Sequence, residues 1–322
     1  MTLIPLTLAV ADYPHTRAIK NGSIPIEGVV PTFADVTPQV AAYRRMVRQV
    51  EFDVCELAPT TYLIARAYGA PFVALPIFVM RRFHHSGLLV QSRLLIRSPK
   101  DLEGKKVGVR AWSVTTGVWT RGILEDEFGL DCTKVTWVVD DEEHVTQLRL
   151  PPNVTHAPPG RSLAAMMADG ELVAGFDANA GIGRAGPPVA GWDKNKVATS
   201  IYPDLFEHAD ALEAEWFKRT GIYPMHGTIV VKDSVLAAHP WVAGALFRAF
   251  ERAKTEWLAT LDTGAATDAD KKYSQLRKIV GPDPLPNGLK ANLPTIRALE
   301  EYAFRQGLIP NRMPIEKAFV DL

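Results

Sequence analysis

Ionisable side chains gather directly after two apolar stretches that the residue pattern predicts to be buried strands. Glu56 follows the run FDVC, and Arg81, Arg82 and His85 follow the run FVALPIFVM. Open α/β sheets bind ligands just outside the carboxyl ends of their strands. Residues 52–86 are therefore predicted to form one wall of a binding cleft.

A second cluster of this kind follows the first predicted strand, about Leu6–Ala11, and contains Asp12, His15 and Arg17. An imidazole exchanges protons near neutral pH, and a guanidinium binds carboxylates through a planar pair of N–H groups. Ionisable groups of this type are also common in purely structural roles. The residue types therefore indicate a small-molecule site and leave open which histidine, if either, reacts.

The second half of the chain offers a different type of site, at the start of a helix predicted over Val114–Phe128. Ser113 is expected to cap this helix, and Thr115 and Thr116 add two hydroxyl groups to its first turn. Free N–H groups at a helix start bind carboxylates or phosphates. The neighbouring Trp112 could stack on an aromatic ligand or belong to the core, and both interpretations stay open.

Two acidic features carry less information. Asp177 follows a predicted strand, as the other candidate residues do. The run Asp140–Glu143, followed by His144, could bind a metal ion, but oxygen-ligand sites generally need a folded cage rather than consecutive carboxylates. A solvated loop is the favoured interpretation of this run.

The elements that position these residues alternate between strands and helices. Apolar residues at helical spacing, proline at a first turn and glycine after a last turn predict helices over residues 37–50, 60–68, 114–128, 242–261 and 295–306, with Thr37 as one capping residue. The order of strand, turn and helix restarts at DLEGKKVGV, and YPMHGTIVVK returns the chain. We therefore expect an α/β protein of two lobes with a central cleft and two crossings. Residues 1–87 and 222–322 form the first lobe, and residues 88–221 form the second.

The composition favours a small-molecule partner over a polymer. The 322 residues include 36 Lys and Arg and 36 Asp and Glu, so no net charge attracts nucleic acid or a membrane surface. Cys55 and Cys132 belong to no metal-binding or disulfide pattern. The start of the chain has no basic region typical of a signal peptide, and no apolar run approaches the length of a membrane span. We expect a cytoplasmic homo-oligomer that contacts neither nucleic acid nor membrane.

Several motifs, in combination, resemble those of a known enzyme family. The motifs are DYPHTR (12–17), FDVCELAPTTYLIAR (52–66), RRFHHS (81–86), VGVRAWSVTTGVWTRGIL (107–124), VDDEEHV (139–145), LPPNV (150–154), GIYPMHGTIVVK (221–232), HPWVAGALFRAFERAK (239–254) and GLKANLPTI (288–296). With its two lobes, the chain resembles the type II periplasmic-binding-protein fold. More narrowly, it resembles the 4,5-dihydroxyphthalate decarboxylase family, over nearly its whole length.

The resemblance implies conversion of 4,5-dihydroxyphthalate to protocatechuate and carbon dioxide, in the breakdown of phthalate. Direct loss of carbon dioxide would leave an aryl anion, so the ring carbon is expected to be protonated first. His85 is the favoured proton donor, with His15 as the alternative, and Glu56 is expected to orient the catechol or to ionise a hydroxyl group. Arg17 and Arg81 are the candidates for binding the carboxylate that stays on the ring.

The full set of residues expected to bind the substrate is Asp12, Arg17, Arg81, Trp112, Ser113, Thr115, Thr116, Asp177 and His226. No organic cofactor and no metal ligand are expected, because the hydroxyl group para to the carboxylate supplies the electrons.

Other interpretations of the same residues are open. Glu56 could cap the following helix, and Arg82 could lie on the surface or between the lobes. His84 and His85 point to opposite faces of an extended segment, so at most one of them serves a given pocket. The main alternative function is a non-catalytic binding protein for an aromatic or dicarboxylic acid, and another enzyme of the same fold is a third possibility.

Overall fold

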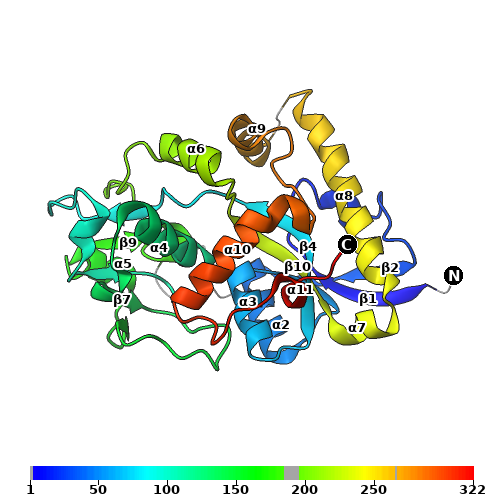
Figure 1. Cartoon of the computed structure of the whole chain (residues 1–322), viewed down its shortest axis with the longest axis horizontal. Helices are drawn as coiled ribbons and strands as arrows, with labels where there is room; N and C mark the ends of the chain where they lie inside the picture. Colours follow the sequence, from blue (N-terminus) through cyan, green and yellow to red (C-terminus); the bar gives the residue numbers. More distant parts are fainter. Residues whose placement is uncertain (1–2, 185–195, 265–266) are drawn as a thin grey trace. The chain divides into compact units, whose positions relative to one another are not determined.

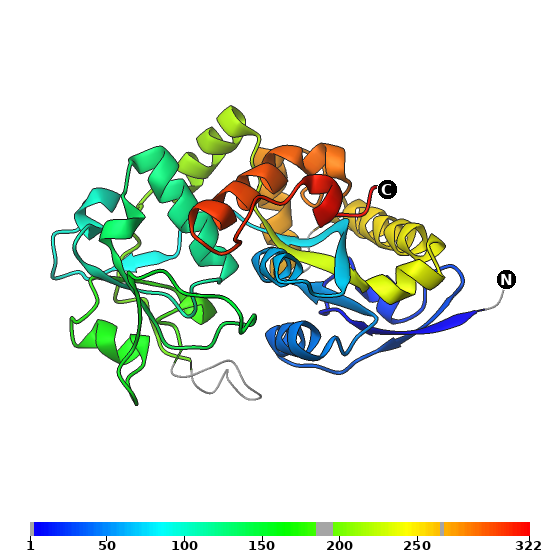
Figure 2. The same cartoon turned by 60° about the horizontal axis from the view of Figure 1, so that its bottom comes forward.

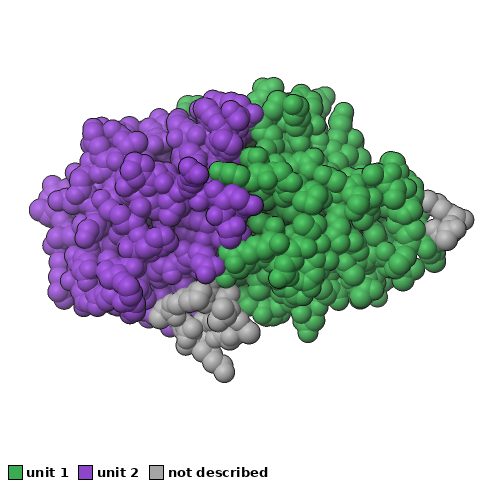
Figure 3. Space-filling view, turned by 90° about the horizontal axis from the view of Figure 1, so that it is seen from below, with its two compact units in different colours: residues 1–82, 217–298, 313–322 green, residues 83–216, 299–312 purple. Residues whose placement is uncertain are grey.

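The computed structural model describes residues 3–184, 196–264 and 267–322, and it divides into two compact units (Figure 1, Figure 3). Unit 1 comprises Met1–Arg82, Phe217–Ala298 and Met313–Leu322, and unit 2 comprises Phe83–Trp216 and Leu299–Arg312. The chain thus leaves unit 1 after residue 82 and returns to it after residue 216. The sequence analysis placed these two crossings five residues later, after residues 87 and 221. Residues 299–312, which that analysis assigned to the first lobe, pack with unit 2.

Unit 1 is built around a five-stranded mixed sheet in the order β2-β1-β3-β10-β4. Its strands are β1 (Ile4–Ala9), β2 (Val29–Phe33), β3 (Val54–Leu57), β4 (Phe72–Arg81) and β10 (Met225–Lys232). β1 runs parallel to β2 and β3, whereas β10 runs antiparallel to β3 and β4. The carboxyl ends of β1, β3 and β4 therefore share one edge of the sheet, where the predicted site residues of unit 1 begin.

Helices cover both faces of this sheet (Figure 1, Figure 2). On one face, α1 (Arg17–Lys20) and α8 (Trp241–Leu261) pack on a cluster that includes Leu8, Val54 and Ile229. Successive strand residues point to opposite faces, so Cys55 and Leu57 face the side of α2 (Gln39–Gln49) and α3 (Pro59–Ala67). Unit 1 also contains α7 (Asp233–Ala238), α9 (Asp268–Val280) and α11 (Ile315–Ala318), together with the first part of α10 (Leu289–Arg305) and the last residues of α6 (Ala209–Thr220).

Unit 2 has a second five-stranded sheet, in the order β5-β9-β6-β7-β8. Its strands are β5 (Leu88–Val90), β6 (Lys106–Gly108), β7 (Thr136–Val139), β8 (Val154–His156) and β9 (Ala174–Phe176), and only β5 runs antiparallel to its neighbour. The helices are α4 (Thr115–Phe128), α5 (Leu163–Ala168) and most of α6 (Ala209–Thr220), with short 3-10 turns at η1 (Pro99–Leu102), η2 (Cys132–Lys134) and η3 (Ala178–Ala180). No helix in the described ranges is long and apolar enough to cross a membrane.

The predicted helices are present, and their boundaries differ at the amino ends. Pro59 begins α3 and Gly129 ends α4 in a left-handed conformation, as the sequence predicted. Neither Thr37 nor Ser113 is the capping residue, because α2 is preceded by Pro38 and α4 by Val114, and neither cap makes a side-chain hydrogen bond. The helix predicted over 295–306 begins earlier, at Leu289.

The end of α10 belongs to unit 2 because its side chains pack tightly against α4. The Tyr302 ring lies edge-on to Trp119, with ring centroids 5.6 Å apart. Gly122 makes this approach possible, since a Cβ atom there would lie 2.3 Å from Cδ2 of Tyr302. The Gln306 side chain, just beyond the helix, accepts a hydrogen bond from Nε of Arg121 and donates one to the carbonyl of Val118.

We predict that Gly122→Ala destabilises the protein by about 1–3 kcal/mol, because the added methyl group must displace the Tyr302 ring in a packed interior. Urea unfolding measures this change. The control is Gly244→Ala in α8, where the new methyl group meets only the flexible end of Arg248, so the gain in helix propensity of about 1 kcal/mol should dominate. Equal effects of the two substitutions would contradict the proposed packing.

Candidate active site

Glu56 on β3 is fully buried, and both of its carboxylate oxygens accept hydrogen bonds. Oε1 accepts from the hydroxyl groups of Tyr13 (2.7 Å) and Tyr43 (3.2 Å), and Oε2 accepts from the backbone N–H of Ala11 (3.0 Å). Burial raises the pKa of Glu56, and these hydrogen bonds oppose that shift. Glu56 thus joins the loop after β1 to the end of β3.

Glu56 does not cap the following helix. The residue before α3 is Ala58, which makes no side-chain bond, and the Glu56 carboxylate is directed to Tyr13 and Tyr43 instead. On the neighbouring strand β10, a Cβ atom at Gly227 would lie 3.0 Å from Oε1 of Glu56. The absence of a side chain at this position leaves room for the carboxylate.

His15 is buried beside this cluster and is held in one tautomer. Its Nε2 lies 2.8 Å from the carbonyl oxygen of Val79, and because a carbonyl only accepts, Nε2 must carry the proton. Nδ1 is then the unprotonated nitrogen, and it has no hydrogen-bond partner among the described residues. The ring stacks on Tyr13 at 5.3 Å and contacts Trp257 at 5.1 Å and Tyr273 at 6.2 Å. Burial lowers the pKa of His15 to about 4, so at neutral pH this imidazole is neutral and can accept a proton at Nδ1.

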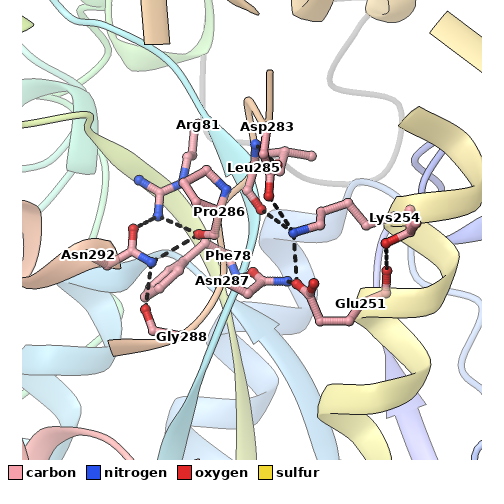
Figure 4. Close-up of polar contacts among 11 residues, drawn as sticks. Phe78, Arg81, Glu251, Lys254, Asp283, Leu285, Pro286, Asn287, Gly288 and Asn292 are labelled. Carbon is pink, nitrogen blue, oxygen red and sulfur yellow. Dashed lines mark hydrogen bonds and ion pairs between the residues drawn. The ribbon is translucent and has the colours of Figure 1, made fainter. Parts of the chain in front are cut away.

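Arg81 is fully buried, and its guanidinium is engaged by the protein itself (Figure 4). Nη1 donates to the carbonyl of Tyr223 (2.6 Å), and Nη2 donates to the carbonyl of Pro286 (3.1 Å) and to the side chain of Asn292. The group also lies over the Phe78 ring, 4.8 Å from its centre. Burial lowers the pKa of Arg81 to about 10. The expectation that Arg81 binds a substrate carboxylate is not supported, because no surface of its side chain is open to a ligand.

Side chains of α8 also bond the segment between α9 and α10, which contacts Arg81 (Figure 4). Nζ of Lys254 donates to the carboxylates of Glu251 and Asp283, each at 2.8 Å. The side chain of Asn287 donates to Glu251 (2.6 Å) and accepts from the backbone N–H of Phe78 (2.7 Å). These bonds tie the segment between α9 and α10 to the end of β4.

Asp12 and Arg17 remain on the surface of unit 1. Nε of Arg17 lies 3.3 Å from Oδ2 of Asp12, and the two side chains are 54% and 58% exposed. An ion pair this exposed contributes at most about 1 kcal/mol, so a ligand can displace it at small cost. Of the two arginines predicted to bind a carboxylate, Arg17 is the accessible one.

Arg82 and His226 lie together in unit 1. Nη2 of Arg82 is 3.3 Å from Nε2 of His226, and since a guanidinium only donates, Nε2 of His226 is the unprotonated nitrogen. Burial lowers the pKa of Arg82. This contact defines the tautomer of His226, and both side chains are partly buried.

His85 in unit 2 resembles His15 in its environment. It is 2% exposed, its ring lies edge-on to Trp216 with centroids 5.2 Å apart, and its Nδ1 has no hydrogen-bond partner within the described part of the chain. Burial lowers the pKa of His85 to about 4. The chain therefore holds two neutral imidazoles at neutral pH, one in each unit, each with an unpartnered Nδ1.

The predicted anion seat at the start of α4 accepts a carboxylate of the protein itself. Oε1 of Glu143 accepts a hydrogen bond from the backbone N–H of Trp112 (2.6 Å), and Oε2 accepts one from the backbone N–H of Ser113 (3.2 Å). Thr115 and Thr116, at the first turn, are buried. The carboxylate that these two amides bind comes from the loop after β7 and not from a ligand.

Trp112 is a core residue, which resolves the open choice between stacking on a ligand and packing. The Arg121 guanidinium lies 3.5 Å from the centre of the Trp112 ring, and Trp112 Nε1 donates to the carbonyl of Gln306 (3.1 Å). Only 3% of Trp112 is exposed. An internal cation–π contact therefore occupies one face of the Trp112 ring.

The acidic run Asp140–Glu143 is neither a solvated loop nor a metal site. Asp140 pairs with Arg184 at 3.0 Å and Asp141 pairs with Arg110 at 3.1 Å, and all four side chains are at least nine-tenths buried. Burial raises the pKa of Asp140, while Arg184 opposes the shift. Across the described ranges, no group of three or more His, Cys, Asp or Glu residues is arranged to hold a metal ion.

Asp177 also bonds within the protein. Its Oδ1 accepts from the backbone N–H of Ala178 (2.6 Å) and from the hydroxyl group of Thr199 (2.7 Å), and it caps the short turn η3. These bonds engage Oδ1 of Asp177, a residue that was expected to bind the substrate, in contacts within the protein.

Each unit has a hollow of its own, and neither is lined by the predicted catalytic residues. The hollow in unit 1, about 510 Å³, lies between Arg66 and the C-terminal segment 313–321. The hollow in unit 2, about 200 Å³, is lined by Trp112, Cys132 and Arg305, among others.

Sequence reasoning missed the aromatic residues that surround His15. Tyr13 lies inside the motif DYPHTR, but nothing in that motif shows that its hydroxyl group bonds to Glu56. Trp257 and Tyr273 come from α8 and α9, more than 240 residues away along the chain, and their approach to His15 is a property of the fold.

The two mixed five-stranded sheets define a two-lobed protein of the type II periplasmic-binding-protein class. The fold is similar to that of the alkanesulfonate-binding protein SsuA from Xanthomonas axonopodis pv. citri, with a TM-score of 0.53 and 15% identity over 100% of this chain and 98% of that one. It is also similar to the desulfurization enzyme DSZB, with a TM-score of 0.54 and 13% identity over 98% and 96% of the two chains. Both binding proteins and enzymes therefore use this fold.

Sequence comparison is more specific. The chain is 31% identical to a 4,5-dihydroxyphthalate decarboxylase of Comamonas testosteroni in an alignment of 332 residues, which covers 99% of this chain and 97% of that protein. It is 35% identical over 180 residues to a 4,5-dihydroxyphthalate decarboxylase of Pseudomonas putida, covering 53% of this chain and 69% of that protein. The chain belongs to the 4,5-dihydroxyphthalate decarboxylase family. No protein-family model matches it.

We predict that Arg81→Lys lowers the free energy of unfolding by at least about 2 kcal/mol, because an ammonium group cannot reach the carbonyls of Tyr223 and Pro286 together. Urea unfolding measures the loss. Arg17→Lys, in an exposed pair, is the control and should change stability by less than about 0.5 kcal/mol. Unchanged stability of Arg81→Lys with weakened substrate binding would restore Arg81 as a substrate ligand.

The buried histidines predict a pH dependence of stability. The pKa of His15 falls from 6.5 to about 4 on folding, so below pH 6.5 the unfolded chain binds a proton that the folded chain does not. The free energy of unfolding must therefore fall as the pH drops through this range, by up to about 1.4 kcal/mol per pH unit for this group.

Urea unfolding of the wild type and of His15→Phe at a series of pH values isolates this contribution from carboxylates that titrate nearby. The phenyl ring can preserve the aromatic packing and does not titrate, so the variant should lose stability less steeply with falling pH. Identical slopes for the two proteins would contradict this, because they would show that folding leaves the pKa of His15 unchanged.

Proposed function

We propose that this chain decarboxylates 4,5-dihydroxyphthalate to protocatechuate and carbon dioxide. The observation that carries the proposal is the 31% identity, over 97% of its length, to a protein named for that activity. The buried imidazoles His15 and His85 support it, since each can exchange a proton at an unpartnered Nδ1. An aromatic dicarboxylate is the class of substrate to test first.

The reaction needs a proton on the ring before it loses carbon dioxide. Ionising the hydroxyl group para to one carboxylate pushes electrons onto the carbon that bears that carboxylate. A proton then forms a C–H bond at this carbon, the C–C bond to the carboxylate breaks, and its electron pair restores the aromatic ring. The electron push comes from the substrate, so the proposal includes no organic cofactor.

We assign the proton donor to His85. With a pKa of about 4, His85 is neutral at neutral pH without substrate, but a bound dicarboxylate raises the pKa of a nearby imidazole. Proton uptake would then accompany binding, and the proton would be present when the ring carbon needs it. Under this assignment, His85 becomes a proton donor only when the substrate is bound.

His15 fits the opposite role. Its Nε2–H is committed to Val79, so the side chain presents an acceptor and is suited to take the proton of a hydroxyl group. Glu56 acts one step away, since its carboxylate bonds the hydroxyl group of Tyr13, which stacks on His15. Arg17 is the accessible candidate for the carboxylate that remains on the ring.

The alternative function is a binding protein for an aromatic or dicarboxylic acid, which the shared fold permits. The family relationship favours the enzyme over this alternative. Incubating the purified protein with 4,5-dihydroxyphthalate and measuring protocatechuate and carbon dioxide separates the two. Binding without release of carbon dioxide would refute the enzymatic proposal.

We predict that phthalate, which lacks both hydroxyl groups, binds as a competitive inhibitor and is not decarboxylated. It keeps both carboxylates, but its ring carbon lacks the para oxygen that supplies electrons. 4-Hydroxyphthalate should react slowly and lose only the carboxylate para to its hydroxyl group, as NMR of the product would show. Loss of the meta carboxylate, or rapid turnover of phthalate, would contradict ring protonation driven by the para oxygen.

A further inference from the structure

The loop that carries His85 is fixed by side chains from outside the loop. The hydroxyl group of Thr120 on α4 donates to the carbonyl of His84 at 3.1 Å. At the other end of the loop, the carboxylate of Asp204 accepts the backbone N–H of Gly87 at 2.5 Å. Gly87 has a φ of 88°, a conformation that favours glycine, and it lets the chain turn into β5.

The middle of this loop is held by Glu213 on α6. The Glu213 carboxylate accepts the backbone N–H groups of His85 and Ser86. Trp216 lies three residues further along α6, on the same face of the helix, and its ring contacts the His85 ring. One helix face therefore contacts the imidazole through Trp216 and fixes its backbone through Glu213.

We propose that Glu213 is a positioning residue for His85, which its carboxylate holds in place through two backbone N–H groups. This inference rests on the proposed function, because it assumes that the placement of His85 limits turnover. Two N–H groups are best satisfied by a carboxylate, whose oxygens only accept. A protonated carboxyl group has one O–H donor, which would face an N–H and weaken the attachment of the loop.

Burial and the neighbouring negative charges place the protonation of Glu213 near neutral pH. Glu213 is 8% exposed, and burial raises its pKa to about 7, with Asp210 on the same helix and Asp204 in the preceding loop adding negative charge. The N–H groups of His85 and Ser86 act in the opposite direction. As the pH falls through about 7, Glu213 takes up a proton and the loop should loosen.

The test follows the loop and the reaction separately. The amide NMR shifts of His85 and Ser86 should titrate with a midpoint near 7 in the wild type, and this titration should vanish in Glu213→Gln. Asp210→Asn removes a neighbouring negative charge, so it should move the midpoint to lower pH. Glu215→Gln is the matched control, because Glu215 is exposed on the same helix, and its titration should match the wild type.

Turnover should show the same dependence. kcat for 4,5-dihydroxyphthalate should fall below the wild-type midpoint, and Glu213→Gln should lose the pH step and about tenfold in kcat, with KM changed by less than about twofold. A merely structural role would lower the melting temperature without moving the pH profile. In Asp210→Asn, the midpoint of the kcat profile should shift to lower pH together with the midpoint of the amide titration.

Three results would overturn the proposal: amides that titrate unchanged in Glu213→Gln, an amide midpoint that does not move in Asp210→Asn, or a kcat profile in Glu213→Gln identical to the wild type. The second result decides the matter if Glu213→Gln does not fold. A wild type that releases no carbon dioxide would refute the proposed function, while amide titration that depends on Glu213 would still support its hold on the loop.

Discussion

Burial of ionisable side chains at strand ends and in the loops that follow them governs both units of this protein. Moving a charge out of water costs several kcal/mol unless partners replace the lost hydration, so each buried group must either be paired or lose its charge. His15 and His85 lose their charge. Arg81 and Arg121 keep theirs, stabilised by carbonyl groups, amide side chains and aromatic faces. The same constraint therefore produces neutral imidazoles and structural arginines that are bonded within the protein.

This constraint links the two carboxylates Glu56 and Glu213 to the two histidines. In each case burial raises the pKa of the carboxylate, and the group is stabilised by N–H or O–H donors on the segment that carries a histidine. Glu56 reaches His15 through the hydroxyl group of Tyr13, whose ring stacks on the imidazole. Glu213 reaches His85 through the backbone. The charge state of each carboxylate can therefore alter the position of the histidine ring through the segment that lies between them.

The sequence predicted the features that depend on local chemistry. The strand ends, the start of α3 at Pro59 and the end of α4 at Gly129 follow from residue type and periodicity. The sequence could not predict that Arg81 is buried and bonded within the protein, because its partners Pro286 and Asn292 lie more than 200 residues further along the chain. Glu143 was missed for a similar reason, since only the register of the fold brings it to the amides before α4. Residue type thus predicts which groups can react, and long-range packing decides which of them a ligand can reach.

The same fold serves binding proteins and enzymes, so the difference must lie in side chains rather than in topology. A binding site for an anion needs positive charges that stay fixed over the working pH range. A decarboxylase that protonates its substrate needs groups whose proton occupancy changes when the substrate binds. Under the proposed function, His15 and His85 are these groups, because each is neutral at neutral pH and its Nδ1 has no hydrogen-bond partner among the described residues. Burial of an imidazole removes its charge, which would weaken anion binding in a binding protein. In an acid–base catalyst, the same burial makes proton uptake by the imidazole depend on the bound substrate.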